Sequence, residues 1–404
     1  MVKLGTGLGD KSRPKRKVLI IMKKAFLLLL GAALCVCACA PESMPDASLE
    51  GTKVDVSVFP ESIRKVFVLN EGGMGSNNAS LDLLQVSGGT YVNGVFKKMN
   101  PEEGAGLGDV GNDIVVNGNE VWIAVCNSGI VEVLDAKSEK QIAAITVPTP
   151  RSIAFDNKYA YVSSWAGAYV NGSYDAEGNY TITDSKNPKG QVYRIDLKTK
   201  KVEGSVEVGY QPEGIACYGG KVYVANSGGL SCQLPPDYAY DKTVNVIDTK
   251  KFEVELTLDV QVNLEKVYSD GNGRIYVTTL GNYGDVHSGL YVIDSEYKVS
   301  KVADYVSKSC ISGDTVYFVG AENEFDWNAP KEFFTRSCKA GTVSYLSLQP
   351  DAKTPYGICA IAEDTFLIAD AGDYFNPGSV SLYHDGTKIW TVDAGVCPGH
   401  FAIW

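Results

Sequence analysis

The side chains of this sequence that could carry out chemistry are few in kind. Its three histidines, His287, His384 and His400, are too far apart for a metal-binding motif. The sequence contains no GxSxG nucleophile elbow, no Walker-type phosphate loop and no EF-hand run. We therefore expect a binding protein rather than an enzyme, with no metal and no cofactor.

Acidic side chains leave one enzymatic alternative open. Four of them, Asp109, Asp113, Glu213 and Glu265, fall close to the ends of predicted strands. They could hold a cation there, as in some metal-dependent lyases and lactonases. The commoner situation in proteins is that such acids are solvated or accept hydrogen bonds from loop amides.

Large aromatic and amphipathic side chains in predicted loops are the candidate ligand-binding residues. Side chains of this type supply rigid contact area with a polar tip, which is what binding surfaces use. The alternative is that each long loop packs its own rings as a small satellite core. The candidates are Trp165, Tyr169, Tyr210, Tyr238, Tyr283, Trp327, Arg336, Tyr356, Tyr374 and His400.

A repeated unit must position these side chains. Residues 212–260 predict four short β-strands, because a small apolar segment is followed by segments of alternating polarity. The second strand of this unit recurs seven times, at a spacing of about 50 residues. Its copies are Val66-Phe67-Val68, Val121-Trp122-Ile123, Ala160-Tyr161-Val162, Val222-Tyr223-Val224, Ile275-Tyr276-Val277, Val316-Tyr317-Phe318 and Thr365-Phe366-Leu367.

A third strand is predicted after every copy. These third strands are LDLL from Leu81, VEVLD from Val131, VYRID from Val192, VNVID from Val244, LYVID from Leu290, VSYLS from Val343 and VSLY from Val380. A four-stranded sheet cannot bury both apolar faces alone, so seven such sheets must stack, and closure into a ring removes the exposed ends. The predicted fold is all-β, a seven-bladed β-propeller of four-stranded blades over residues 63–404.

The two ends of the chain are predicted to meet in the first blade. The strand that begins at Lys65 is of the second-strand type and has no first strand before it. Residues 398–403 resemble the first strand at 212–216. We therefore expect the C-terminal strand to close the ring.

The predicted loops differ between the two faces of the ring. Turns between first and second strands, and between third and fourth strands, are short and polar. Loops between second and third strands, and connections between blades, are longer and carry most of the aromatic candidates. We expect the ligand site on the loop-rich face.

The amino-terminal part is predicted to direct export. Residues 1–38 contain a basic segment, an apolar run too short to span a membrane and small residues at the end, as in a signal segment, with Met22 favoured as the true start. Cys39 is the predicted lipid acceptor, because the residues before it resemble a bacterial lipobox. Residues 39–62 are then a lipidated flexible tether that anchors the chain to a membrane. Export without lipidation is the alternative.

Charge and cysteine content limit the partners. Removal of residues 1–38 leaves 29 basic and 47 acidic residues, a net charge near −18, which argues against nucleic acid. Cys217 and Cys359 occupy equivalent positions in first strands and are expected in the core. Cys232 and Cys338 lie in predicted loops and could form a disulfide.

The repeat resembles a known family. Tyr223-Val224-Ala225-Asn226, followed by Val244-Asn245-Val246-Ile247-Asp248, is similar to the YncE-type, or YVTN-repeat, propellers, and the resemblance covers residues 63–404. The lipoprotein signal together with VFVLNEGGMGSNNASLDLL at 66–84 is similar to exported propeller lipoproteins of Bacteroidetes, which include the BtuG-type surface cobalamin-binding proteins.

This resemblance implies a function. It suggests an outer-membrane lipoprotein, displayed at the cell surface, that captures a corrinoid (vitamin B12) on the loop-rich face and passes it to a BtuB-like TonB-dependent transporter. It assigns no individual corrin contact in this chain. A propeller that binds surface glycans or another protein is the alternative, and a metal-dependent propeller lyase or lactonase is the third.

Overall fold

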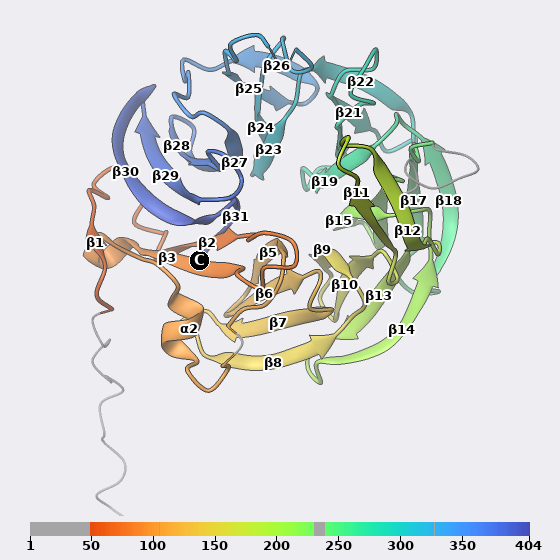
Figure 1. Cartoon of the computed structure of the whole chain (residues 1–404), viewed down its shortest axis with the longest axis horizontal. Coiled ribbons are helices and arrows are strands. Elements are labelled where there is room, and N and C mark those ends of the chain that lie inside the picture. Colours follow the sequence, from red (N-terminus) through yellow and green to blue (C-terminus); the bar gives the residue numbers. More distant parts are fainter. Residues whose placement is uncertain (1–48, 105, 230–238, 327) are drawn as a thin grey trace, which may run out of the picture. The chain divides into compact units, whose positions relative to one another are not determined.

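The protein is described by a computed structural model that covers residues 49–104, 106–229, 239–326 and 328–404. Residues Glu50–Trp404 form one compact unit. Within it, seven antiparallel sheets surround a central axis, which confirms the predicted seven-bladed β-propeller (Figure 1). No helix in the described part of the chain is long and apolar enough to cross a membrane.

Blade 1 unites the two ends of the propeller. From the axis outward its strands are β31 (Pro398–Ile403), β2 (Lys65–Asn70), β3 (Ser80–Gln85), β4 (Thr90–Val92) and β1 (Thr52–Lys53). β31 pairs antiparallel with β2, so that Val66 lies opposite Ile403 and Leu69 opposite His400. The predicted closure by the C-terminal strand is therefore confirmed. A 3-10 helix, η1 (Val86–Gly88), and the short helix α2 (Val95–Met99) complete this region.

Blades 2 to 4 each place the strand that comes first in sequence next to the axis. Blade 2 contains β5 (Gly111–Asn117), β6 (Glu120–Val125), β7 (Ile130–Asp135) and β8 (Gln141–Thr146). Blade 3 contains β9 (Pro150–Phe155), β10 (Tyr159–Ser164), β13 (Gln191–Asp196) and β14 (Lys201–Glu207). Blade 4 contains β15 (Pro212–Tyr218), β16 (Lys221–Asn226), β17 (Thr243–Asp248) and β18 (Glu253–Asp259).

Blades 5 to 7 follow the same order. Blade 5 contains β19 (Leu264–Ser269), β20 (Ile275–Thr279), β21 (Gly289–Ile293) and β22 (Val299–Asp304). Blade 6 contains β23 (Lys308–Ser312), β24 (Thr315–Gly320), β25 (Phe334–Lys339) and β26 (Thr342–Tyr345). Blade 7 contains β27 (Pro355–Ala362), β28 (Thr365–Asp370), β29 (Pro377–His384) and β30 (Thr387–Val396).

One strand assignment made from the sequence was wrong. Val343 lies in β26, the outermost strand of blade 6, and the third strand is β25. The sequence of β25, FTRSCK, lacks the expected alternation of apolar and polar residues, because the charged Arg336 occupies an inward position and is only 8% exposed. Its guanidinium carbon lies 4.8 Å from the ring centres of both Phe318 and Phe334, so the aromatic rings accommodate a charge in the sheet.

The hydrophobic cores lie between neighbouring blades. The core that contains Trp122 and Val162 joins blades 2 and 3, and the core that contains Val66 and Leu367 joins blades 1 and 7. Alternation along each strand produces this pattern, because side chains of one face meet the next blade. Cys359 lies in the second of these cores, as predicted for a small apolar side chain.

Part of the predicted tether belongs to the propeller. β1 pairs with β4, and Phe59 is buried against the core of blades 1 and 7, where Val54 and Val56 also pack. Within the described residues, the ordered unit therefore starts by Glu50 rather than at Ile63. Cys39 and the predicted signal lie outside the described residues.

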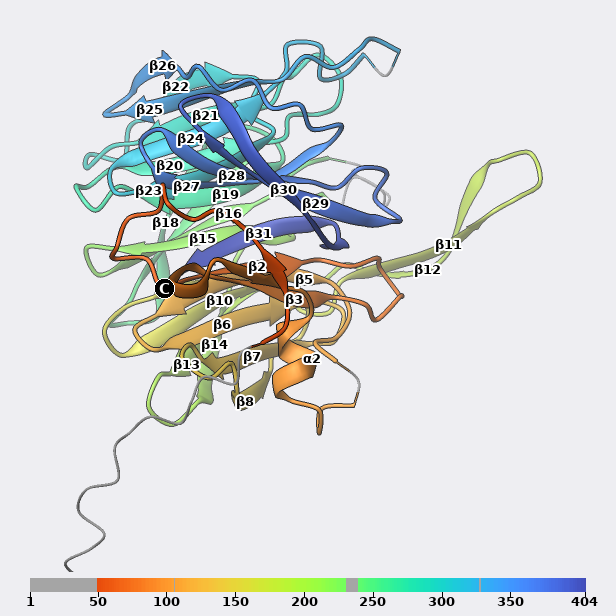
Figure 2. The same cartoon turned by 90° about the vertical axis from the view of Figure 1, so that its left-hand side faces the viewer.

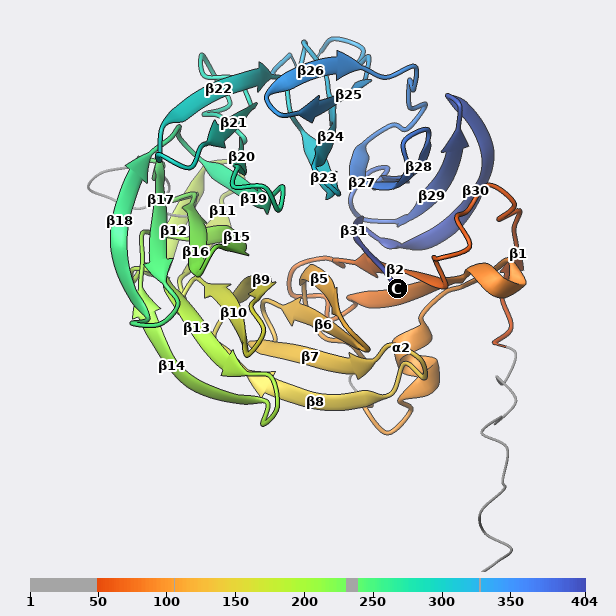
Figure 3. The same ribbon diagram turned by 180° about the vertical axis from the view of Figure 1, so that it is seen from behind.

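The loops are distributed over the faces as the strand order requires. We call the face with the loops between second and third strands the loop face, and the opposite one the turn face. Figure 1 looks onto the loop face and Figure 3 onto the turn face. In blade 3 the loop between β10 and β13 contains a hairpin of β11 (Tyr169–Tyr174) and β12 (Tyr180–Lys186), which extends away from the blades on the loop face (Figure 2).

Candidate functional site

A cavity of about 930 Å³ lies at the centre of the ring. All seven innermost strands line the cavity. Each contributes residues near its N-terminal end, which lies at the loop face. Side chains from the loops and from the start of β27 form its rim, which we call the channel mouth: Met74, Trp165, Tyr240, Tyr283 and Tyr356. The volume is in the range typical of small-molecule sites.

One group of charged side chains spans blades 2 to 4. The Arg151 Nε donates to Glu213 Oε2 at 2.8 Å, and its Nη1 donates to Asn112 Oδ1 at 2.6 Å. The guanidinium carbon of Arg151 lies 4.3 Å from the ring centre of Trp165. Arg151 also donates to Cys126 Sγ at 3.5 Å, so it is held in place and in turn fixes the orientation of Trp165 at the channel mouth.

A second group spans blades 5 to 7 and blade 1. Lys308 Nζ lies 3.6 Å from Glu265 Oε1 and 4.4 Å from the ring centre of Tyr356. The Tyr356 hydroxyl donates to Glu71 Oε2 at 2.7 Å, and Glu71 Oε1 lies 2.8 Å from His400 Nε2. This network connects the closing strand β31 to the end of β2.

The pKa shifts of this second group define its protonation state. Burial alone would raise the pKa of Glu71, but the hydrogen bond from His400, the charge of His400 when protonated, the positive charge of Lys308 and the hydrogen bond from Tyr356 bring it down to about 2. Burial and the positive charge of Lys266 lower the pKa of His400. Because an ionised carboxylate can only accept a hydrogen bond, Glu71 favours the neutral tautomer of His400 that carries its proton on Nε2 and leaves Nδ1 as an acceptor.

In the first group, burial and ion pairing shift the pKa values of Arg151 and Glu213 in opposite directions. Burial alone would lower the pKa of Arg151, but the negative charge of Glu213 outweighs it and raises that pKa, so the guanidinium stays charged. Burial raises the pKa of Glu213, although Arg151 and Lys266 act to lower it. The carboxylate of Glu213 therefore depends on its cationic neighbours to remain ionised.

The acids that could have held a cation have protein partners. Glu213 and Glu265 pair with Arg151 and Lys308. Asp113 accepts a hydrogen bond from the Ile153 amide, and Asp109 accepts one from the Gly75 amide, both at 2.9 Å. The two aspartates thus show the amide-bound alternative to a metal site, whereas the two glutamates form ion pairs that the sequence did not predict.

Four of the ten predicted ligand-binding residues line the cavity: Trp165, Tyr283, Tyr356 and His400. Tyr374 is half-exposed and packs edge-to-face on Tyr356, with ring centres 5.7 Å apart. The structure brings these five side chains to one end of the channel, from blades 1, 3, 5 and 7.

The other five predicted residues lie elsewhere or are not described. Tyr169 belongs to the β11–β12 hairpin, where its hydroxyl donates to Asp184 Oδ2 at 2.8 Å. Tyr210 is partly exposed in the connection before β15 and is not among the lining residues. Arg336 lies within β25 rather than in a loop. Tyr238 and Trp327 lie outside the described residues.

Sequence reasoning missed Glu71, Lys266 and Lys308 as site residues. All three line the cavity, and two of them stand in the first three positions of an innermost strand. A repeat alignment centred on those positions would have found Lys266 and Lys308 beside Arg151 and Glu213. The role of Glu71 depends on ring closure, because its partner His400 is 329 residues away in sequence.

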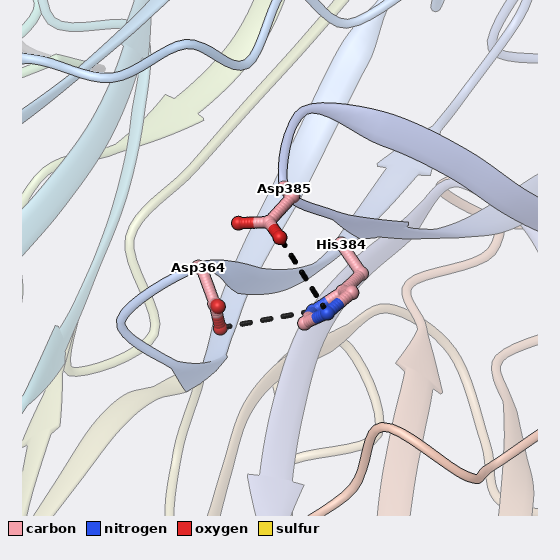
Figure 4. Close-up of side chains that lie close together, drawn as sticks. All are labelled: Asp364, His384 and Asp385. Atoms are coloured by element: carbon pink, nitrogen blue, oxygen red, sulfur yellow. Dashed lines mark ion pairs between the residues drawn. The ribbon is translucent and has the colours of Figure 1, made fainter.

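A separate cluster lies on the turn face of blade 7 (Figure 4). His384 Nδ1 is 3.7 Å from Asp364 Oδ1, and His384 Nε2 is 3.8 Å from Asp385 Oδ2. The Thr365 hydroxyl also lies 2.9 Å from His384 Nδ1. Because the two carboxylates approach opposite nitrogens of one imidazole, the arrangement fits a local ion-pair cluster better than shared coordination of a metal.

The cysteines of the described residues show no disulfide. Cys338 is buried and free, while Cys232, its predicted partner, lies outside the described residues. Burial raises the pKa of Cys310, which lines the cavity, to about 12. The Cys310 thiol is therefore protonated near neutral pH and is not an activated nucleophile.

The fold and this site define the class of the protein: a seven-bladed β-propeller with an axial cavity that opens among aromatic side chains. No protein-family model matches the chain, and no curated protein sequence matches it. Among solved structures, it is similar to a quinoprotein alcohol dehydrogenase-like protein from Bacteroides thetaiotaomicron, with a TM-score of 0.56 and 13% identity over 84% of this chain and 78% of that one.

It is also similar to the hydrazine synthase of Kuenenia stuttgartiensis. That similarity has a TM-score of 0.52 and 17% identity over 72% of this chain and 88% of that one. At such identities the likeness supports the β-propeller fold alone.

Proposed function

We propose that the protein is a capture protein that binds a corrinoid such as vitamin B12 at the channel mouth and passes it to a TonB-dependent outer-membrane transporter. The observation that carries this proposal is the combination of an axial cavity of about 930 Å³ with a rim of Trp165, Tyr240, Tyr283 and Tyr356. Flat aromatic surfaces suit the macrocycle, and phenol and amide groups suit its amide fringe.

The charges of the cavity also favour binding over metal-dependent catalysis. Glu213 and Glu265 pair with basic side chains, and Glu71 is held by Tyr356 and His400. A metal-dependent lyase would need carboxylates available for coordination. The resemblance to corrinoid-binding lipoproteins supplies the ligand class.

Titration calorimetry of the mature domain tests the proposal, with cyanocobalamin, cobinamide and a panel of glycans. We expect tight binding of the corrinoids that a chelator does not change. Tyr283→Asn should weaken it by about 2 kcal/mol, near thirtyfold, because a rigid aromatic anchor is lost. Asparagine is the substitute because Tyr283 has a φ of 56°, which asparagine tolerates.

Tyr345→Asn is the matched control. Tyr345 is also exposed, but it lies on β26, the outermost strand of blade 6. This variant should bind corrinoids as the wild type does. Absence of heat with both corrinoids, or binding of glycans alone, would refute corrinoid capture.

Lipidation is tested separately by Cys39→Ser. We expect this change to release the exported protein from membranes, because the acyl chains are its anchor. Cys37→Ser is the control and should leave the protein membrane-bound. Membrane fractionation reads out the anchor, and protease treatment of intact cells reads out surface display. If Cys39→Ser protein stays in the membrane fraction, the anchor is elsewhere.

A further inference from the structure

Lys266 differs from the other cationic side chains of the cavity. Arg151 pairs with Glu213, and Lys308 lies 3.6 Å from Glu265 and over the ring of Tyr356. Lys266 also lines the cavity, from the third position of β19. Within the described part of the chain, its ammonium group has no ion pair within 4 Å and donates no hydrogen bond; only its backbone amide is bonded, to Thr278.

The neighbours of Lys266 do not neutralise it. Burial and, after it, the positive charge of Lys266 lower the pKa of His400, which favours a neutral imidazole beside Lys266. The charge of Lys266 also acts to lower the pKa of Glu213, but the Glu213 carboxylate is bonded to Arg151 at 2.8 Å. The ionised Glu71 accepts hydrogen bonds from Tyr356 and His400. The cavity thus contains a positive charge whose nearby carboxylates are already engaged.

An unpaired ammonium group in a cavity attracts an anion from outside the protein. Walls of low dielectric strengthen the attraction between Lys266 and an entering negative group compared with the same pair in water. A phosphate group suits this site, because it can accept hydrogen bonds from the lysine ammonium at one oxygen while the others remain solvated.

We infer that Lys266 binds the phosphodiester of the captured ligand, so that the nucleotide loop of a complete corrinoid enters the axial cavity. This inference rests on the proposed function. It divides the site into an aromatic rim for the macrocycle and a cationic interior position for the phosphate. The consequence is discrimination between cobalamin, which has the phosphodiester, and cobinamide, which lacks it.

The test compares the dissociation constants of cyanocobalamin and cobinamide for four proteins. Lys266→Met should weaken cyanocobalamin about tenfold or more and leave cobinamide within about twofold. Lys266→Arg keeps the charge and should restore most of the loss. Lys250→Met, in the exposed turn between β17 and β18, removes one positive charge far from the cavity and should change neither constant.

Two results would overturn the inference while leaving corrinoid capture intact. One is an equal effect of Lys266→Met on both ligands, and the other is no effect on either. If neither corrinoid binds any of the proteins, the proposed function fails, and inorganic phosphate then decides the anion site. At low ionic strength, millimolar phosphate should raise the melting temperature of the wild type more than that of Lys266→Met. Equal shifts would show that Lys266 binds no phosphate.

Discussion

A chain that ends at Cys397 is expected to lose the folded propeller altogether. The deletion of residues 398–404 removes β31, which supplies the innermost strand of blade 1 and pairs with β2 over five registered positions. It also removes Trp404, whose backbone carbonyl accepts hydrogen bonds from the amides of Arg64 and Lys65. The result would be an open ring with an unpaired, fully buried strand newly exposed at its edge.

Solubility and thermal melting followed by circular dichroism measure this effect. The control removes the same net number of residues outside the hydrophobic cores: residues 173–181 of the β11–β12 hairpin are replaced by Asn-Gly, a turn suited to two paired strands. That variant should melt as the wild type does, because the hairpin forms its own two-stranded sheet. A truncated chain that melts at the wild-type temperature would contradict closure by β31.

The number of blades could be predicted from the sequence because the second strand is buried on both faces in every blade. Apolar triplets such as Val222-Tyr223-Val224 must repeat for the blades to stack. Where another interaction replaces apolar packing, the pattern fails. β25 was missed for that reason, since Arg336 lies against aromatic rings where a small apolar side chain is usual.

The candidate site could be predicted only in part. Aromatic side chains in long loops indicated Trp165, Tyr283 and Tyr356 at one face, and the structure places them around one cavity. The charged interior could not be predicted, because pairs such as Glu71 with His400 exist only after ring closure and in one register of β31 on β2. Sequence composition shows such charges without showing which of them remain unpaired.

Replacement of Arg151 by methionine is expected to destabilise the propeller by about 3 kcal/mol at neutral pH. The change removes the 2.8 Å bond to Glu213 and the 2.6 Å bond to Asn112. The side chain of Glu213 is only 19% exposed, so its carboxylate would lose its counterion in a largely desolvated position. Methionine keeps much of the volume against Trp165, so lost charge rather than lost packing dominates the effect.

The loss of stability in Arg151→Met should depend on pH in a defined direction. Burial already raises the pKa of Glu213 in the wild type, and removal of Arg151 would raise it further. A carboxyl group whose pKa is higher in the folded than in the unfolded chain stabilises the fold only at low pH, and that stability is lost as pH rises through the folded pKa. The deficit of Arg151→Met in urea unfolding should therefore be smaller at about pH 5 than at about pH 8.

A second substitution isolates the buried charge as the cause. Arg151→Met combined with Glu213→Gln should recover most of the lost free energy of unfolding and its pH dependence, because no unpaired carboxylate remains. Lys189→Met, which breaks the exposed pair with Glu207, should leave the unfolding midpoint nearly unchanged. If the double variant is as unstable at pH 8 as Arg151→Met alone, then the contacts of Arg151 with Asn112 and Trp165, and not its charge pairing, hold blades 2 to 4 together at the axis.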